Sequence, residues 1–185
     1  MRDISLHLLD LMENSLRAGA TLVHCDLSLS PEGMLDIRLK DNGCGMAPDL
    51  QQSVLSPFGT TRTTRKVGLG IPLTAANAAK TGGSLQIHSN PGQGTTLDIR
   101  FNTRHMDCLP LGDVAQSLWS LVITHPLSPE FTLTMTSPQG ESRFSTQEIR
   151  EVLGEEIPLN TPEVSAYLRD LLMEQAQTVF GGLLL

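Results

Sequence analysis

Few residues of this chain could cross-link it or bind a soft metal ion. Only three of its 185 residues are cysteine, namely Cys25, Cys44 and Cys108, and no Cys-x-x-Cys pair occurs. The sequence therefore excludes a disulfide framework and gives no support to a cysteine-based zinc or iron–sulfur site. Scarce, scattered cysteines favour a reducing compartment, so we expect the protein in the cytoplasm.

Long hydrophobic runs and clustered positive charge are also absent. No run approaches the roughly 18 apolar residues that a membrane-spanning helix needs. Acidic residues interrupt the apolar pattern of residues 1–15, which is not typical of a signal peptide. Basic residues number 13 against 20 acidic ones, for a net charge of −7. A nucleic-acid-binding face or a polybasic membrane anchor needs clustered positive charge, so we expect neither nucleic acid nor membrane as a partner.

Hydrophobic residues make up 39% of the chain, which is enough for the core of one domain with a small appendage. Residues 3–102 switch between helical and strand-like spacing of their apolar positions. The predicted order is one helix (3–19), two strands (21–30 and 34–40), two helices (48–55 and 69–83) and two strands (84–90 and 95–102). Each strand pair encloses a short turn and predicts an antiparallel hairpin. Such strands mixed with long helices predict an α+β fold.

The character of the sequence changes after residue 104. We expect residues 1–104 to form one domain and residues 105–185 a small α+β extension, to which the sequence assigns no role. The predicted parts of this extension are a connector (105–114), a segment that fits either helix or strand (115–126), a hairpin (130–146), a helix capped by Ser145 or Thr146, and a last helix over residues 161–180.

The stretch DNGCGM, residues 41–46, directly follows the second predicted strand. Asp-Asn-Gly is a common turn composition, and glycine adopts the positive φ angles that tight turns require. Taken alone, the stretch predicts a turn and nothing more.

Three further elements accompany this stretch. Asp10 and Asn14 lie four residues apart in the first predicted helix and therefore share one face. The tripeptide GLG, residues 68–70, opens a helix after a basic loop, and GTT, residues 94–96, begins the last strand of the first region. Each element is weak alone, but all four in this order and these structural contexts form a specific pattern.

This pattern resembles the GHKL superfamily, named for gyrase, the Hsp90 chaperones, histidine kinases and the MutL mismatch-repair proteins. The resemblance covers residues 3–102. Residues 11–21 are similar to the first helix of the mismatch-repair ATPases, and residues 56–101 are similar to the end of a histidine kinase catalytic domain. The resemblance implies the Bergerat ATP-binding fold, a two-layer sandwich with helices on one face of a mixed, mostly antiparallel sheet. It also implies ATP and Mg²⁺ as the bound ligands.

For adenine, the resemblance implies a site at the end of the second strand. Asp41 would accept a hydrogen bond from the exocyclic amine of the ring. Gly43 and Gly45 would let the backbone approach the ring where a Cβ atom would clash. Thr95 or Thr96 would hold a water molecule at the same edge, and Met46, Ile71 and Leu73 would supply apolar surroundings.

For the phosphates, the resemblance implies the helix that follows the basic loop. Gly68, Leu69 and Gly70 would offer backbone N–H groups at a helix N-terminus, which is a natural anion site. Arg65 and Lys66 would add positive charge from a lid over residues 57–67. This segment has few apolar residues after Phe58, so we expect it to be mobile without nucleotide.

For the metal and the reaction, the resemblance implies the first helix. The amide oxygen of Asn14 would bind Mg²⁺, which needs few protein ligands, and Arg17 would point towards the phosphates. Gyrase-like members carry a glutamate general base four residues before the asparagine, and here that position is Asp10. Because the aspartate is shorter and Glu13 points about 100° away on the helix, we expect Asp10 to act as a weak base.

Three functions fit these residues. The first is a stand-alone, kinase-like regulator that phosphorylates a protein partner in trans, since no phosphoacceptor hairpin precedes residue 3. The second is a slow ATPase whose nucleotide state gates a protein contact. The third is a nucleotide-binding module without turnover. The oligomeric state stays open, and the five histidines share no spacing pattern, so we expect them in the core or on the surface.

Overall fold

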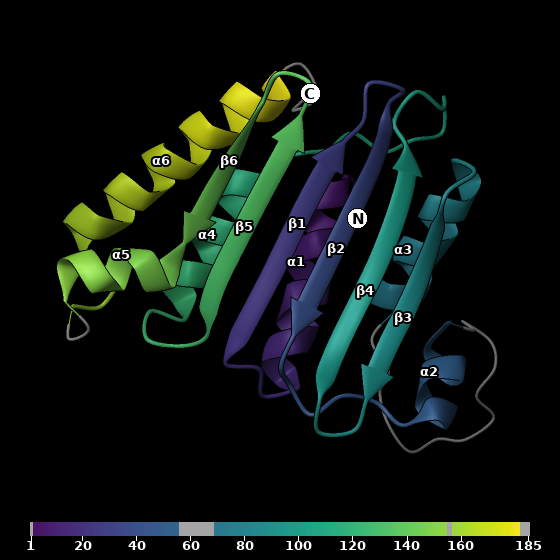
Figure 1. The fold of residues 1–185 in the computed structure, drawn as a ribbon, viewed down its shortest axis with the longest axis horizontal. Coiled ribbons are helices and arrows are strands. Elements are labelled where there is room, and N and C mark those ends of the chain that lie inside the picture. Colours follow the sequence, from purple (N-terminus) through teal and green to yellow (C-terminus); the bar gives the residue numbers. More distant parts are fainter. Residues whose placement is uncertain (1, 56–68, 155–156, 182–185) are drawn as a thin grey trace.

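The computed structural model describes residues 2–55, 69–154 and 157–181 (Figure 1). Its elements are α1 (Ile4–Arg17), β1 (Leu22–Leu29), β2 (Met34–Asp41), α2 (Pro48–Leu55), α3 (Gly70–Lys80), β3 (Ser84–Asn90), β4 (Gly94–Asn102), α4 (Val114–Thr124), β5 (Glu130–Ser137), β6 (Gly140–Ser145), α5 (Thr146–Leu153) and α6 (Pro162–Phe180). The predicted order of elements is confirmed, and the segment that fitted either helix or strand is helical in α4. None of the helices in the described ranges is both long and apolar enough to cross a membrane.

All six strands form one sheet in the order β3-β4-β2-β1-β5-β6. Neighbouring strands are antiparallel except β1 and β5, which run parallel with Leu22 opposite Glu130. In Figure 1, α1, α3 and α4 lie behind the sheet, and α6 runs beside β5 and β6 while packing on α4. The expected two-layer α+β sandwich with a mixed, mostly antiparallel sheet is therefore confirmed.

The core lies between the sheet and these helices. Val23, Cys25 and Leu27 of β1 alternate inward and are at most 2% exposed, as the period of two requires. The same apolar cluster includes Leu8 of α1 and Leu133 of β5. The described residues 105–154 and 157–181 thus extend the sheet and the core of the first region. The division into a domain of residues 1–104 and an extension of residues 105–185 stays a prediction.

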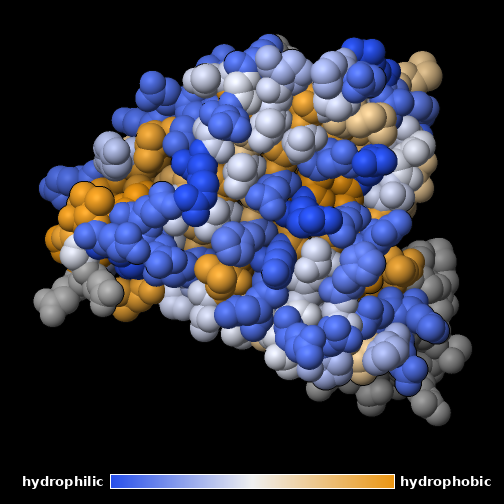
Figure 2. All heavy atoms as spheres, viewed as in Figure 1, coloured by the Kyte–Doolittle hydropathy of each residue, from blue (hydrophilic) through white to orange (hydrophobic). Residues whose placement is uncertain are grey.

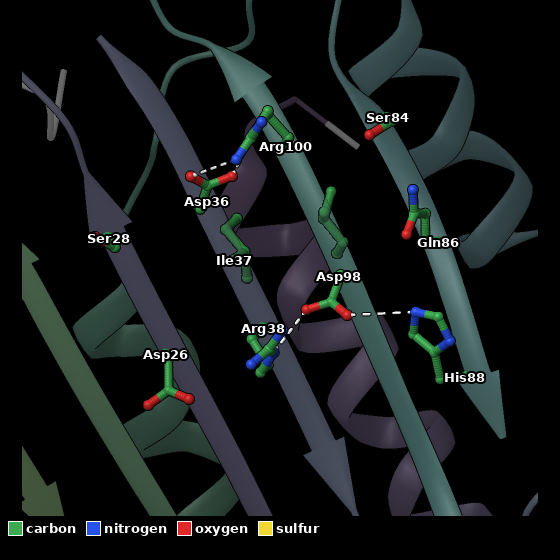
Figure 3. Close-up of a pocket in the computed structure, with 11 residues that line it drawn as sticks. Asp26, Ser28, Asp36, Ile37, Arg38, Ser84, Gln86, His88, Asp98 and Arg100 are labelled. Atoms are coloured by element: carbon green, nitrogen blue, oxygen red, sulfur yellow. Dashed lines mark hydrogen bonds and ion pairs between the residues drawn. The ribbon is translucent and has the colours of Figure 1, made fainter. Parts of the chain in front are cut away.

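The opposite face of the sheet is polar (Figure 2). Arg100 of β4 donates to both oxygens of Asp36 on β2, at 2.5 and 3.1 Å, and Arg38 of β2 donates to Asp98 of β4 at 2.6 Å (Figure 3). His88 of β3 faces Asp98 at 3.7 Å. These exposed cross-strand pairs each contribute little to stability. These residues line a hollow of about 580 Å³, which is the concave, solvent-facing surface of the twisted sheet.

The connector fixes the start of α1. Asp3 caps the helix, since its carboxylate accepts from the backbone N–H of Leu6 at 2.9 Å. The carbonyls of Pro110 and Leu111 accept from the N–H groups of Ile4 and Ser5, at 3.0 and 2.8 Å. The connector thereby satisfies helix donors that would otherwise be unpaired, and it anchors the helix that carries the predicted site residues.

Candidate functional site

Asp41 lies at the end of β2 and is only 8% exposed. Its Oδ1 accepts hydrogen bonds from the backbone N–H groups of Gly43, at 2.8 Å, and of Thr95, at 3.3 Å. Its Oδ2 accepts one from the hydroxyl of Ser15 at 2.8 Å. Three donors therefore fix the carboxylate. Because an ionised carboxylate has about four acceptor positions, Asp41 keeps capacity for one further donor.

Ser15 is a site residue that the sequence argument missed. It is 4% exposed and directly follows Asn14 in α1. It continues the buried stripe of Leu8, Leu11 and Met12 that faces the core. A serine in such a stripe needs a buried hydrogen-bond partner, and this was the available signal for a polar contact at Asp41.

The glycines after Asp41 let two loops approach closely. Gly45 has a φ of +66°, and a Cβ atom added there would lie 2.0 Å from the carbonyl oxygen of Asn90. A Cβ atom at Gly43 would lie 2.9 Å from the carbonyl oxygen of Ala18. From the sequence, both glycines are expected to let the backbone approach the adenine ring. The structure gives a second reason, because both positions pack against the protein's own chain.

Ser89 joins the same loops and was also missed. Its hydroxyl donates to the carbonyl of Gly94 at 2.9 Å and accepts from the backbone N–H of Met46 at 2.8 Å. The Thr95 hydroxyl lies 2.9 Å from the Ser89 oxygen. Since the Ser89 proton is used on Gly94, Thr95 donates in this contact and keeps its own lone pairs for a water molecule or a ligand.

Asp10 and Asn14 meet the first residue of α3. The Asp10 Oδ2 atom lies 1.7 Å from the place that a Cβ atom at Gly70 would occupy, and Asn14 Nδ2 lies 3.7 Å from it. Only glycine fits at this position without displacing Asp10. Among the described residues, the buried Oδ2 of Asp10 has no hydrogen-bond partner. A buried carboxylate oxygen without a partner is costly, and this one lies at the start of α3 beside Gly70.

Arg17 holds the amide oxygen of Asn14. Its guanidinium donates to Asn14 Oδ1 at 2.9 Å and to Glu13 Oε2 at 2.7 Å. The side chains of Arg17 and Glu13 are 62% and 44% exposed, and such surface pairs have a free energy of about 0–1 kcal/mol. A metal ion could therefore replace Arg17 at the Asn14 oxygen at small cost.

His7 ties α1 to α3 one turn from the start of α3. Its Nδ1 lies 2.9 Å from Thr74 Oγ1, and its Nε2 lies 2.9 Å from Asn77 Nδ2. Thr74 already donates its proton to the Gly70 carbonyl at 2.8 Å, so His7 donates from Nδ1 and accepts at Nε2 as a neutral ring. Burial lowers the pKa of His7 below its ordinary value. The sequence predicted a histidine in the core or on the surface, and His7 lies in the core. Its two polar partners were not visible in the sequence.

The structure brings the predicted residues together in two groups. The first group lies at the end of β2 and the start of β4, and it contains Asp41, Gly43, Gly45, Met46 and Thr95. The second group, where α1 meets α3, contains Asp10, Asn14, Arg17 and Gly70. Helix α1 joins the groups, because Asn14 belongs to the second and its neighbour Ser15 contacts the first.

The remaining predicted residues are placed less fully. Leu69 precedes α3 as its N-cap residue and is 64% exposed. Arg65, Lys66, Gly68 and the predicted lid over residues 57–67 lie outside the described residues.

The oxygen atoms at the second group suit a hard cation. Mg²⁺ prefers oxygen ligands and retains most of its water, so Asn14 and Asp10 could hold it together with a phosphate. Within residues 2–55, 69–154 and 157–181, no group of three or more His, Cys, Asp or Glu side chains could hold a metal ion alone. The donor set therefore fits Mg²⁺ only when a ligand supplies further oxygens.

Comparisons with known proteins agree with this arrangement. Residues 2–105 match the family described as "Histidine kinase-, DNA gyrase B-, and HSP90-like ATPase". A "Non-motile and phage-resistance protein" of Caulobacter vibrioides is 31% identical over 116 residues, which are 57% of this chain and 14% of the relative. A "Cell-division control histidine kinase PdhS" of Brucella ovis is 31% identical over 115 residues, which are 54% of this chain and 11% of the relative. The chain thus spans a small part of the curated relatives that it matches.

A solved structure shares the fold across most of the chain. The Aquifex aeolicus MutL ATPase domain complexed with ADP superimposes with a TM-score of 0.50 at 17% identity, covering 83% of this chain and 69% of that one. The N-terminal domain of a DNA repair protein gives a TM-score of 0.51 at 14% identity and covers 98% of this chain and 58% of that one. With the family match over residues 2–105, these likenesses lead to one conclusion: the chain belongs to the histidine kinase-, DNA gyrase B- and HSP90-like ATPases.

Proposed function

We propose that the chain binds ATP with Mg²⁺ and transfers the terminal phosphoryl group to a protein partner in trans. The observation that carries the nucleotide assignment is the fixed carboxylate of Asp41. Three donors hold it at a strand end, and its remaining acceptor capacity matches the exocyclic amine of adenine, which is a donor. The family match and the ADP bound to the MutL neighbour support the same ligand.

In this proposal the phosphates and the metal ion lie at the contact between α1 and α3. The N–H groups at the start of α3 favour anionic oxygens. Asn14 would offer its amide oxygen to Mg²⁺, and Arg17 would then be released towards the phosphates. The cation would offset negative charge on the phosphates during the reaction.

The proposed transfer uses a side chain of the partner as nucleophile. This side chain forms a bond to the terminal phosphorus while the bond from that phosphorus to the bridging oxygen breaks, and ADP leaves. The Oδ2 of Asp10, which has no hydrogen-bond partner among the described residues, is the acceptor for the nucleophile's proton in this proposal. His7 is not the acceptor of the phosphoryl group, because it is 1% exposed and both its ring nitrogens are bonded. The match to a histidine kinase supports transfer over simple hydrolysis.

The direct test follows the label of ATP radiolabelled at the terminal phosphate. The full chain is incubated with this ATP and Mg²⁺, alone and with a cell extract, beside an Asp10→Asn variant. The proposal expects label on a protein of the extract with the parent chain, and none with the variant. Release of free phosphate alone would instead support the slow ATPase. Bound but unchanged ATP would support a module without turnover.

A further inference from the structure

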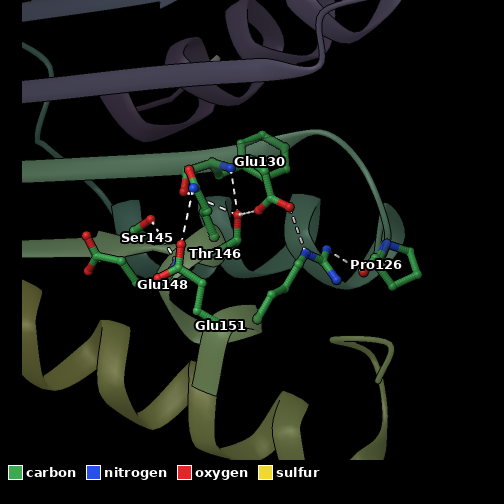
Figure 4. A network of polar contacts seen from close by, with 9 residues as sticks. Pro126, Glu130, Ser145, Thr146, Glu148 and Glu151 are labelled. Carbon is green, nitrogen blue, oxygen red and sulfur yellow. Dashed lines mark hydrogen bonds and ion pairs between the residues drawn. The ribbon is translucent and has the colours of Figure 1, made fainter. Parts of the chain in front are cut away.

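Helix α5 is attached to the rest of the molecule mainly by polar contacts. Of its residues only Thr146 and Arg150 are buried. Arg150 donates from Nε to Glu130 Oε1 at 2.8 Å and from Nη2 to the carbonyl of Pro126 at 2.6 Å (Figure 4). The Thr146 hydroxyl donates to Glu130 and accepts from the N–H of Phe131. The buried side of α5 is thus largely polar. Ile149 packs partly against the core, whereas Val152 and Leu153 are exposed.

Those apolar side chains line a groove between α5 and α6. Ile149, Val152 and Leu153 of α5 form one wall, and Val164, Tyr167 and Leu171 of α6 form the other. Phe144 of β6 contributes to the lining, and the volume is about 570 Å³. We call this space the α5–α6 groove. Its volume lies within the roughly 300–1,000 Å³ of ordinary binding pockets.

Large apolar side chains of the groove lie in solvent. Val152 is 85% exposed and Tyr167 is 61% exposed. Figure 2 shows apolar surface at this end of the molecule. An apolar patch that is built into two helices and rimmed by polar groups is typical of a protein-binding surface. The groove lies at the β6 edge of the sheet, whereas the site around Asp41 lies at β2 and β4, so the two surfaces are separate.

The charges at the rim are mostly negative. Glu148 and Glu163 line the groove, and Glu151 is exposed on α5. The rim cation Arg143 is already paired with Glu148, and Arg150 is buried against Glu130. Negative rims on two copies would repel each other, which disfavours a homodimer through this groove. A partner with positive charge beside its apolar residues is the complement.

We propose that the α5–α6 groove binds an amphipathic helix of a partner protein, with lysine or arginine flanking its apolar stripe. Two helical walls over an apolar floor suit the binding mode in which a helix places residues i, i+3 or i+4, and i+7 into a groove. The basic flanks would face Glu163, because Glu148 is already paired with Arg143. This docking role goes beyond the proposed phosphoryl transfer and does not depend on it.

The test uses three synthetic, dye-labelled peptides of about 18 residues, or about five helical turns. One has a leucine stripe with lysine on the polar face, the second has glutamate in place of lysine, and the third is a scrambled form of the lysine peptide. Binding to the full chain is measured by fluorescence polarisation. We expect the lysine-stripe peptide to bind at least tenfold more tightly than either of the others.

Substitutions then locate the binding surface. Val152→Asp and Tyr167→Asp should each weaken the lysine-stripe peptide at least tenfold, and Glu163→Lys should weaken it while strengthening the glutamate peptide. Met106→Asp is the matched control, because Met106 is 93% exposed in the connector and should leave binding unchanged. ATP affinity should be unchanged in all four variants, which also shows that they are folded.

Three outcomes would overturn the proposal. Equal binding of the scrambled peptide would reduce the effect to charge attraction. Equal losses in Met106→Asp and Val152→Asp would remove the groove from the contact. A concentration-dependent dimer in sedimentation that Val152→Asp dissolves would assign the groove to a second copy of the chain.

Discussion

Two regions of the molecule, the β5–β6 end of the sheet and the contact between α1 and α3, hold charged side chains in different ways. At the β5–β6 end, Arg150 and Glu130 are paired, and Thr146 and the Pro126 carbonyl complete their contacts. Where α1 meets α3, the Oδ2 of Asp10 is buried without a partner among the described residues. A charged group whose polar contacts are complete costs the fold less than one with an unpaired buried oxygen, so the two regions should respond differently to substitution.

Unpaired neutral groups, unlike the unpaired carboxylate oxygen, also occur away from the candidate site. The hydroxyl of Ser142 and the amide oxygen of Gln175 are also buried and unpaired within the described part of the chain, on β6 and α6. An unpaired neutral group costs less than an unpaired charge, so these two are tolerable in a structural region. Among the charged residues, we therefore expect substitution of Arg150 to lower stability and substitution of Asp10 to lower the rate of the reaction.

The largest effect is expected at Arg150. Arg150→Ala removes the buried partner of Glu130, which is 26% exposed and keeps only the Thr146 hydroxyl as a donor, and this should lower the free energy of unfolding by about 2–3 kcal/mol. The measurement is urea denaturation. Arg143→Ala is the control, because Arg143 and Glu148 form an exposed pair whose loss should cost less than about 1 kcal/mol. Similar losses in the two variants would show that burial does not set the strength of the Arg150 pair.

The opposite pattern is expected at Asp10. Asp10→Asn keeps the shape of the side chain but removes the proton acceptor, so phosphoryl transfer or turnover should fall about 100-fold or more. ATP affinity should change little, and the urea midpoint should stay equal or rise, since a buried unpaired charge is removed. Single-turnover kinetics with radiolabelled ATP measures the rate. A variant as active as the parent, or one that loses stability as Arg150→Ala does, would assign Asp10 to the fold.

Asp41 combines both roles, because its carboxylate is bonded within the protein and still has acceptor capacity. Asp41→Asn would present an amide donor to the adenine amine and should weaken ATP binding by about 1.5–3 kcal/mol, or roughly 10- to 150-fold. Titration calorimetry with Mg²⁺ measures this affinity. Asp36→Asn, on the open face of the same strand, is the control and should leave affinity unchanged. Unchanged ATP affinity in Asp41→Asn would remove adenine from this site.

The sequence predicted the fold well where local patterns decide it. Alternating apolar residues predicted all three hairpins, and Pro162 and Ser145 marked helix starts that the structure confirms. The segment 115–126 could not be assigned, because its apolar residues suit either state and only packing against α1 and α6 makes it helical. The parallel pairing of β1 with β5 joins strands about 100 residues apart, and no local pattern encodes it.

The site was predictable only in part for a similar reason. Asp10, Asn14, Asp41 and the glycines stand in short motifs that a single sequence reveals. Ser15 and Ser89 act through contacts with Asp41 and Met46, which are distant from them in the chain, and neither serine has a motif of its own. The groove was invisible as well, because the apolar face of α5 would ordinarily be assigned to the core. Its exposure follows from the polar attachment of Arg150.

The smallest effect is expected from His7, which lies at the α1–α3 contact but is structural in its bonding. Burial lowers its folded-state pKa below the ordinary value of about 6.5, so the unfolded chain binds a proton more readily. The neutral ring therefore makes its full contribution to the free energy of unfolding above about pH 6.5. This contribution is lost as the pH falls below that value, at no more than about 1.4 kcal/mol per pH unit. Unfolding in urea at pH 7.5 and 5.5 should show this loss in the parent and a smaller one in His7→Gln, which does not titrate.

His88→Gln, which removes an exposed ring, is the control and should show the same change in the free energy of unfolding between the two pH values as the parent. Equal slopes in the parent and His7→Gln would mean that α1 and α3 accommodate a charged His7, and that the bridge to Thr74 does not depend on the neutral form.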